Sequence, residues 1–230
     1  MTSPHLQSVN LGPARELSGQ DELTAIDKQP VTTPMSVSEL GIAGDEVGDK
    51  PNHGGTYQAL YAFAREDLDL WSERLGCPIP AGFFGENLTT SGIDVNEAIV
   101  GETWRIGTVL VEVVSVRIPC STFALWLRHN GLDDSRWVKR FTAEGRPGPY
   151  LRVLEPGWLS AGNEIVVEHR PDHDVTVSTM FRALTTDRSL LPRLAELDRI
   201  DPEAREVART YLKRTSTAAG TWSADRPTPV

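Results

Sequence analysis

The feature that most constrains the fold is a strongly β-forming run that stops abruptly. Residues 109–116 read Val-Leu-Val-Glu-Val-Val-Ser-Val, which is β-branched and mostly apolar, as is typical of a strand in a covered sheet. Pro119 ends this strand because proline has no N–H to donate to a neighbouring strand. The pair Ser121-Thr122 can then cap a helix over residues 123–129. The sequence predicts a strand-to-helix junction at Cys120.

The local setting of Cys120 permits two interpretations. The unpaired N–H groups and the positive dipole end of a helix N-terminus stabilise a thiolate, and Arg117 adds to the effect. A thiolate there is suited to nucleophilic attack or to binding a metal. The commoner alternative for a lone cysteine is a buried, inert thiol, because Cys is among the most buried residue types. Both alternatives stay open on the local sequence.

Short strands alternate with turns along most of the chain and predict a mainly β fold with inserted helices, of the barrel type. The expected strands cover residues 5–11, 23–26, 31–40, 59–63, 100–107, 109–116, 150–154 and 164–169. The expected helices cover 65–75, 123–129 and 133–141, the last capped by Asp133 or Asp134.

The composition changes at Arg170-Pro171-Asp172, and helical patterns follow. They cover residues 178–184, 188–197 and 202–213, with Asp201 as a cap and Pro202 at a first helical position. We therefore expect three parts: a β-barrel domain at 1–170, a small three-helix unit at 171–214 and a flexible tail at 215–230. A unit of this size is expected to need support from the main domain or from a partner.

Charge and composition exclude several classes of function. A net charge of −9 argues against a binder of nucleic-acid polymers, which need clustered basic residues. The start of the chain lacks a signal-peptide pattern, and no run of about 18 apolar residues occurs, so we expect a soluble, cytoplasmic protein without membrane contact. In that setting Cys77 and Cys120 are expected to remain outside disulfides. The sequence also lacks Walker, Rossmann, nucleophile-elbow and zinc motifs.

Two loops carry further candidate site residues. In His53-Gly54-Gly55, exposed N–H groups of a tight turn can approach a ligand, although a solvated turn explains the motif equally well. Asp45 and Asp49 stand eight and four residues before His53, a spacing that suits a metal only on a helix, and glycines and a proline oppose a helix here. Glu86 and Asn87 can hydrogen-bond a heterocycle, or form a turn before a strand.

Taken in order, these motifs resemble the MOSC family, the domain found at the C-terminus of molybdenum cofactor sulfurases, and in particular its bacterial YiiM-like branch. The resemblance spans roughly residues 6–169, and the helices after Asp174 resemble the three-helix extension of that branch. The matching stretches are 24–31, 44–55, 61–71, 82–88, 101–107 and Arg117-Ile118-Pro119-Cys120.

The resemblance implies a β-barrel that binds a molybdopterin-type molybdenum cofactor, with Cys120 as the protein ligand to the metal. It implies cofactor or substrate contacts at other matching positions. These are Lys28, His53, Gly54, Gly55, Arg65, Glu86, Asn87 and Arg117. Asp67, where many relatives have a histidine, and the stretch 56–58 depart from the family pattern and lie near the expected pocket, so these departures concern the substrate rather than the cofactor.

Relatives in the branch are linked to reduction of N-hydroxylated compounds, including hydroxylated nucleobase analogues, which is a detoxifying reaction. The resemblance therefore implies an oxidoreductase that takes electrons from an external protein, because the chain has no flavin, haem or iron–sulfur motif, and that works as a monomer or homodimer. Two alternatives remain: a sulfur carrier or transferase that uses a Cys120 persulfide, and a non-catalytic binding barrel.

Overall fold

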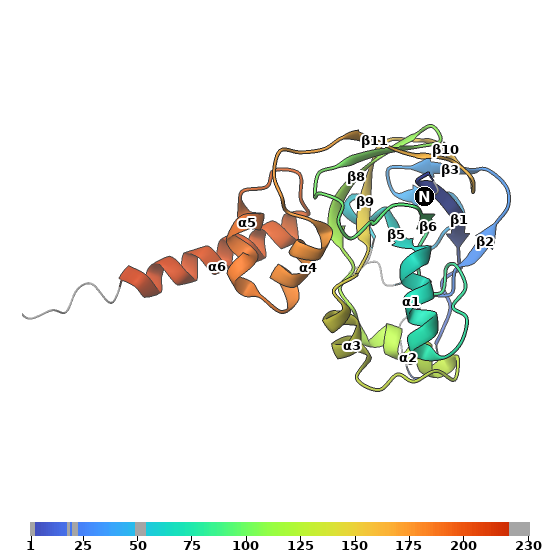
Figure 1. Ribbon diagram of the computed structural model, residues 1–230, viewed down its shortest axis with the longest axis horizontal. Coiled ribbons are helices and arrows are strands. Elements are labelled where there is room, and N and C mark those ends of the chain that lie inside the picture. Colours follow the sequence, from blue (N-terminus) through green and yellow to red (C-terminus); the bar gives the residue numbers. More distant parts are fainter. Residues whose placement is uncertain (1–2, 18, 20–22, 49–53, 221–230) are drawn as a thin grey trace, which may run out of the picture.

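The computed structural model describes residues 3–17, 19, 23–48 and 54–220 (Figure 1). Asp49 and His53 lie outside these residues, and so does the end of the predicted tail.

An eight-stranded mixed sheet forms the main body. Its strand order is β11-β7-β8-β9-β5-β6-β1-β2, and within it β5 and β6 are parallel. The strands are β1 (His5–Leu11), β2 (Gln29–Val31), β5 (Leu60–Ala64), β6 (Leu88–Ser91), β7 (Thr103–Ile106), β8 (Val109–Val116), β9 (Pro149–Glu155) and β11 (Ile165–His169). A smaller sheet has the order β10 (Gly157–Leu159), β3 (Met35–Ser38) and β4 (Gly41–Ile42).

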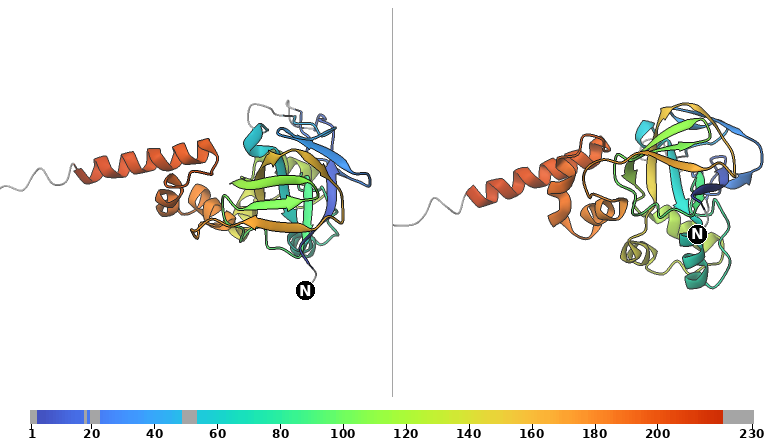
Figure 2. Two further views of the ribbon diagram at one scale, coloured as in Figure 1. Left: turned by 90° about the horizontal axis from the view of Figure 1, so that it is seen from above. Right: turned by 45° about the horizontal axis from the view of Figure 1, so that its top comes forward.

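The barrel prediction is only partly confirmed. The large sheet curls around an apolar interior (Figure 2), and the Leu6 N–H donates to the Asn163 carbonyl at 2.8 Å. The Ile165 N–H of β11 also donates to the Pro4 carbonyl at 3.0 Å, and an isolated bridge joins His5 to Glu164. However, among the described residues these contacts form no continuous ladder between β1 and β11, whose strand pairing is with β7. The sheet is therefore curled but not closed.

Several predicted strands differ from the structure. Residues 23–26 form no strand, and Thr24 makes one isolated bridge to Arg15. The predicted strand 31–40 contains β3 at 35–38 and shares only Val31 with β2, because Pro34 between them cannot donate to a ladder. The short strands β4 and β10 were not predicted, because two or three residues carry too little alternation to be recognised.

Three helices cover one end of the sheet: α1 (Arg65–Leu75), α2 (Ser121–His129) and α3 (Trp137–Glu144) (Figure 1). Helix α1 has the predicted bounds. Helix α2 begins at Ser121, so Cys120 itself occupies the N-cap position. Helix α3 begins later than predicted, because Arg136 before it adopts a left-handed backbone with φ of 51°.

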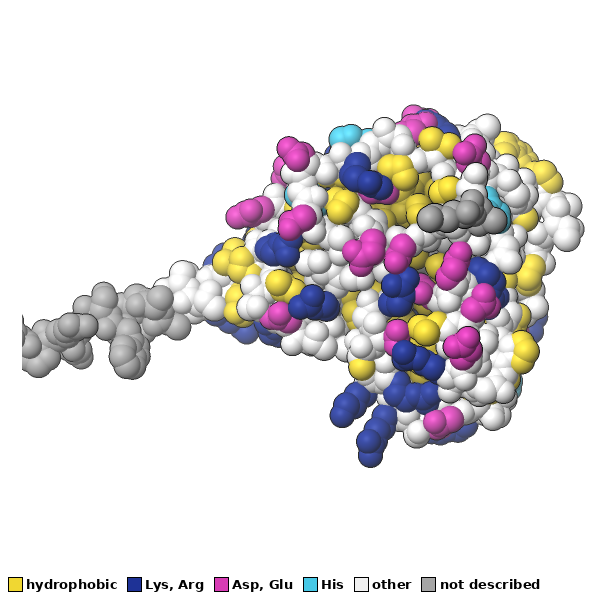
Figure 3. All heavy atoms as spheres, in the orientation of Figure 1, with side chains coloured by type: hydrophobic (Ala, Val, Ile, Leu, Met, Phe, Trp, Pro, Cys, Tyr) yellow, Lys and Arg dark blue, Asp and Glu magenta, His cyan; other side chains and the backbone are white. Residues whose placement is uncertain are grey.

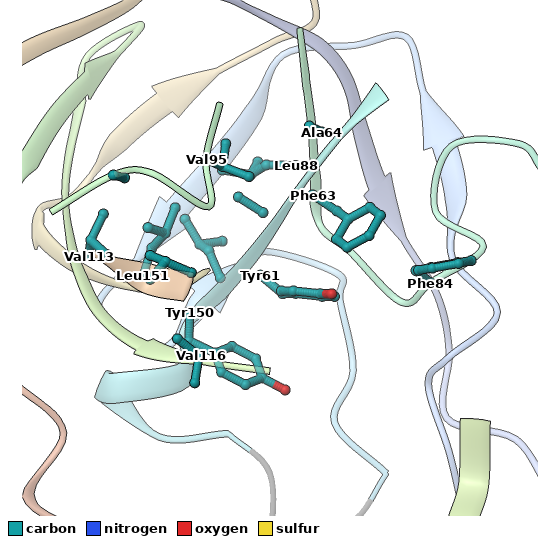
Figure 4. Packing of buried hydrophobic residues seen from close by; sticks show 14 of the residues in the cluster. Tyr61, Phe63, Ala64, Phe84, Leu88, Val95, Val113, Val116, Tyr150 and Leu151 are labelled. Carbon is teal, nitrogen blue, oxygen red and sulfur yellow. The ribbon is translucent and has the colours of Figure 1, made fainter. Parts of the chain in front are cut away.

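Buried aromatic rings hold these helices on the sheet. The Phe84 ring lies 4.7 Å from the Phe123 ring of α2 and 5.0 Å from the Phe63 ring of β5, between centroids. Figure 4 shows Phe63 and Phe84 on neighbouring segments of this interior. Trp71 of α1 and Trp137 of α3 complete the cluster at 4.6 Å from each other. This packing fixes α2, and with it the position of Cys120, relative to the strands.

The C-terminal helices are α4 (Val177–Thr185), α5 (Leu191–Ala195) and α6 (Pro202–Gly220), with a 3₁₀ turn η2 (Arg188–Leu190) before α5. The predicted helix 188–197 is thus η2 and α5 together. Helix α6 continues beyond the predicted end at 213 into the segment predicted as tail. The hydroxyls of Thr215 and Ser216 bond to carbonyls of the preceding turn and so do not compete with the helix.

The main body supports this helical part through specific contacts. The Asp201 N–H donates to the Val114 carbonyl of β8 at 2.9 Å, and the Ser115 hydroxyl donates to the Asp201 carboxylate at 3.1 Å. The Phe181 ring of α4 packs edge-on against Phe141 of α3. Helix α6 itself extends away from the body (Figure 1). The division into a 1–170 domain and a 171–214 unit stays a prediction.

Acidic and basic side chains are interspersed over the face seen in Figure 3, with a local group of basic ones at the edge formed by α2 and α3. Part of that positive charge is compensated, because Arg128 pairs with Asp134 and Arg140 pairs with Asp133.

Candidate functional site

A pocket of about 130 Å³ lies where the end of β8 and the start of α2 meet the loops around residues 23–28, 40–48 and 85–87. Strands β5 and β9 contribute one tyrosine each. The lining residues are Leu23, Thr24, Ala25, Ile26, Lys28, Leu40, Gly41, Ile42, Asp45, Glu46, Val47, Gly48, Gly54, Gln58, Ala59, Tyr61, Gly85, Asn87, Arg117, Cys120, Thr122 and Tyr150.

Cys120 contributes its thiol to this pocket from the N-cap of α2. A guanidinium nitrogen of Arg117, Nη2, lies 3.9 Å from the Cys120 sulfur, and Nη1 donates to the Tyr150 hydroxyl at 2.6 Å. The helix end and the guanidinium both favour the thiolate over the thiol. The predicted electrostatic setting of Cys120 is therefore present.

Arg117 is a cation without a carboxylate partner among the described residues. Burial lowers the pKa of Arg117, but Tyr150, Cys120 and Tyr61 together outweigh it, so the pKa lies above its ordinary value. The guanidinium also lies over the Tyr61 ring, 5.9 Å from its centroid. Its Nε is buried and makes no hydrogen bond. A buried donor of this kind is costly, so it marks a place where an anionic or polar ligand would be favoured.

Lys28 also faces the pocket, but its charge is already matched. Its Nζ lies 2.5 Å and 2.7 Å from the two carboxylate oxygens of Asp45. Burial lowers the pKa of Lys28, and the opposite charge of Asp45 acts against that shift. Asp45 also accepts from the Gly12 N–H and from the Asn87 side-chain amide. Asp45 thus joins the loop 44–48 to β1, to Lys28 and to the segment before β6.

Glu86 lies directly behind the pocket wall and is fully buried. It accepts from the Gly82 N–H at 2.6 Å, the Phe84 N–H at 3.0 Å and the Thr89 hydroxyl at 2.9 Å. Burial raises the pKa of Glu86 to about 7 in spite of these hydrogen bonds. Its contacts shape the turn 82–86 rather than the pocket surface.

Two tyrosines form one wall. Figure 4 shows Tyr61 and Tyr150 on the paired strands β5 and β9, and their ring centroids are 5.3 Å apart. The Tyr61 hydroxyl donates to the Pro147 carbonyl at 2.7 Å, and burial raises the pKa of Tyr61 well above its ordinary value. Tyr61 is therefore a neutral wall residue over the physiological pH range.

The structure brings together many, but not all, of the predicted site residues. Lys28, Gly54, Asn87, Arg117 and Cys120 line one pocket, although they come from four separate segments.

Three other predicted residues lie elsewhere. Glu86 is behind the wall. Gly55 caps the 3₁₀ turn η1 (Thr56–Gln58) and does not line the pocket. Arg65 at the start of α1 pairs with Asp69 and donates to the Ile79 carbonyl, so its guanidinium is used within α1 and the following loop.

The two departures from the family pattern have different positions. Asp67 is not among the lining residues, since it is buried against Arg146 and Asn96. Gln58, from the stretch 56–58, does line the pocket.

Sequence analysis missed Tyr61 and Tyr150 as site residues, because an aromatic residue in a strand has the same local pattern whether it faces a core or a pocket. It also missed Leu23 and Leu40, which are 45% and 70% exposed at the pocket mouth.

Within the described part of the chain, no group of three or more His, Cys, Asp or Glu side chains is placed to hold a metal ion. Neither Cys77 nor Cys120 forms a disulfide. None of the described helices combines the length and the apolar character needed to cross a lipid bilayer.

The curled mixed sheet thus carries a thiol and a partly buried guanidinium in one pocket. The MOSC domain pattern matches residues 49–166, and the chain belongs to the MOSC domain family. MOSC domains are associated with binding of the molybdenum cofactor.

Individual relatives agree with this assignment. The chain is 30% identical over 199 residues to the uncharacterized protein YflK of Bacillus subtilis, covering 86% of each. It is 30% identical over 208 residues to a protein of Gibberella moniliformis named "Reductase", covering 84% of this chain but 36% of that protein. The crystal structure of YiiM from Geobacillus stearothermophilus superposes with a TM-score of 0.74 at 26% identity, covering 90% of this chain and 98% of that one. The resemblance to the YiiM-like branch is confirmed.

Proposed function

We propose that this protein is a molybdenum-cofactor-binding oxidoreductase that reduces N-hydroxylated small molecules, such as hydroxylated nucleobase analogues, with Cys120 as the protein ligand to the metal. The observation that carries the proposal is the position of the Cys120 sulfur, in the pocket, at a helix N-cap and 3.9 Å from Arg117. A thiolate held in this way is a soft ligand of the kind that such a metal prefers.

The residues of the pocket fit the cofactor. An anionic group with a polar ring system needs a cation and hydrogen-bond donors, and the unmatched Arg117 with its unsatisfied Nε supplies both. Asn87 faces the same pocket, but its side-chain amide is already engaged with Asp45 and the Tyr61 backbone. Lys28 is a weaker candidate for an anion contact, because Asp45 already neutralises it.

Reduction of an N-hydroxylated compound breaks the N–O bond, consumes two electrons and two protons, and releases the oxygen as water. When bound, the cofactor supplies the redox-active metal that this reaction requires. In this chain Cys120 would hold that metal, Arg117 would keep the sulfur deprotonated, and the tyrosine wall would limit access of water. The two electrons would come from an external electron-transfer protein, and the naming of one relative as a reductase supports this class of reaction.

We propose that this activity takes place in the cytoplasm as a detoxifying reaction. A monomer or a homodimer is compatible with the proposal.

The test is the metal content of protein purified from a host that makes the cofactor. We expect molybdenum and pterin in the wild type, loss of molybdenum in Cys120→Ala, and full metal in the matched control Cys77→Ala, because Cys77 lies outside the pocket. Wild type without molybdenum, or Cys120→Ala with full metal, would refute the assignment.

A sulfur carrier or transferase is the second candidate, because the same thiol beside Arg117 would stabilise a persulfide anion. Intact-mass spectrometry separates the two functions. An added sulfur atom on Cys120, in protein without molybdenum, would favour the carrier.

A further inference from the structure

The mouth of the pocket differs in character from its base. Arg117 and Cys120 make the base polar, whereas Leu23 and Leu40 at the mouth are large aliphatic residues left 45% and 70% exposed. Ile42, which is buried, continues the apolar surface inward from Leu40. A ligand that fills the whole pocket therefore meets polar groups at one end and aliphatic carbon at the other.

Leu40 is held in place by its backbone. It lies in the tight turn between β3 and β4, where its N–H donates to the Ser38 hydroxyl at 3.3 Å. Gly41 after it has φ of +121°, and an added Cβ there would lie 2.7 Å from the Ala59 carbonyl oxygen. The turn is therefore packed against the segment before β5, and this packing fixes the backbone that carries Leu40.

Leu23 is held in place by a different loop. The next residue, Thr24, exchanges two backbone hydrogen bonds with Arg15, at 2.8 Å and 2.9 Å. Gly48 packs so closely on this segment that an added Cβ would lie 2.2 Å from the Leu23 carbonyl oxygen. Two separate loops thus each present a leucine at one opening, with backbones that other parts of the chain fix.

We propose that Leu23 and Leu40 form an apolar rim that binds the carbon body of the substrate, so that the preferred substrates carry the N-hydroxyl group on a ring-sized apolar body rather than on a small one. This inference rests on the proposed function for the reacting group only. The rim contributes binding by removing apolar surface of both partners from water, and it discriminates by the size of the body.

The test uses two compounds with the same reacting group. Benzamidoxime and acetamidoxime carry one N-hydroxylated amidine on a phenyl ring or on a methyl group. With protein from a cofactor-producing host, we would measure dissociation constants by calorimetry and kcat/KM with a chemical reductant. The wild type should prefer benzamidoxime by about tenfold, the usual scale for extra apolar contact in a pocket.

Leu40→Ser should lower this preference by about fivefold, and Leu23→Ser should lower it in the same direction, because each removes aliphatic carbon from the rim. The matched control is Leu212→Ser, an exposed leucine on α6 outside the pocket, which should leave the preference unchanged. Because Leu40 is exposed, its replacement should leave the fold intact, and circular dichroism checks this.

Different results of these measurements refute the apolar rim and the proposed function. Equal binding of both compounds by the wild type, or an unchanged preference in Leu40→Ser and Leu23→Ser, overturns the rim. A changed elution volume with an unchanged preference means that Leu40 contacts a second copy of the chain, which also overturns it. If loaded protein turns over neither compound, the proposed function fails, and the dissociation constants still decide whether the rim binds the phenyl ring.

Discussion

Glu86 offers a direct test of the electrostatics behind the pocket. Its carboxyl is fully buried, and burial raises its pKa from the ordinary 4.5 to about 7, although three hydrogen-bond donors favour the charged form. Between these two pH values the folded state binds a proton that the unfolded state has released. Rising pH therefore destabilises the folded state, and the stabilisation present below pH 4.5 is lost as pH rises towards 7.

The size of the effect follows from the two pKa values. Since a tenfold change in an equilibrium constant corresponds to about 1.4 kcal/mol, the full difference is roughly 3 kcal/mol, of which roughly 2 to 3 kcal/mol falls between pH 5 and 8. Glu86→Gln places a neutral amide where the protonated acid stands. The free energy of unfolding of the wild type minus that of Glu86→Gln should therefore fall by this amount from pH 5 to pH 8.

The assay is urea unfolding followed by tryptophan fluorescence at pH 5, 6, 7 and 8. Any hydrogen bond that the amide loses to the Phe84 N–H gives a constant offset, which cancels in the comparison across pH. Glu73→Gln, an exposed position on α1, is the control and should give a flat difference. A wild type that gains stability over Glu86→Gln as pH rises would show that the hydrogen bonds from Gly82, Phe84 and Thr89 outweigh burial, and would refute the reasoning.

Three further changes test the packing that positions the site. Phe84→Ala should lower the free energy of unfolding by about 3 to 5 kcal/mol, since it removes the ring that contacts Phe123 and Phe63, and a loss below about 1 kcal/mol by urea denaturation would contradict the central role of this ring. Lys28→Met should cost about 3 kcal/mol because it leaves the Asp45 carboxylate buried without its cation, and combining it with Asp45→Asn should recover part of the loss in thermal unfolding. Thr176→Ala should cost about 1 kcal/mol by removing the side-chain cap that accepts from the Thr179 N–H, and an unchanged melting temperature would show that the cap contributes nothing.

Local chemistry was enough to predict the elements that carry a strong repeating pattern. The strands at 5–11 and 109–116 and the helix at 65–75 have the predicted bounds, because apolar periodicity and end signals agree in each. Where the local signals were weak or were overridden, the prediction failed. Helix α3 starts at Trp137 because Arg136 takes a left-handed backbone, and the pattern of acidic residues before it gave no sign of that.

The residues of the candidate site were likewise predicted only in part. The ordered motifs identified Cys120, Arg117, Lys28, Asn87 and Gly54, all of which line the pocket. They also included Arg65, whose guanidinium pairs with Asp69 outside the pocket. Order along the chain does not show which way a side chain points, so a motif residue can belong to the pocket or to the scaffold beside it.

The sequence by itself determined the strand-to-helix junction at Cys120, because β-branched residues and a proline act over a few neighbouring positions, although the predicted cap by Ser121 or Thr122 was wrong, since Cys120 itself is the N-cap. Only the tertiary structure decided that Arg117 has no carboxylate partner in the described part of the chain, that Asp45 neutralises Lys28, and that the sheet curls without closing. These properties depend on which distant segments become neighbours when the chain buries its apolar surface. Such neighbours leave no trace in the local pattern of a single sequence.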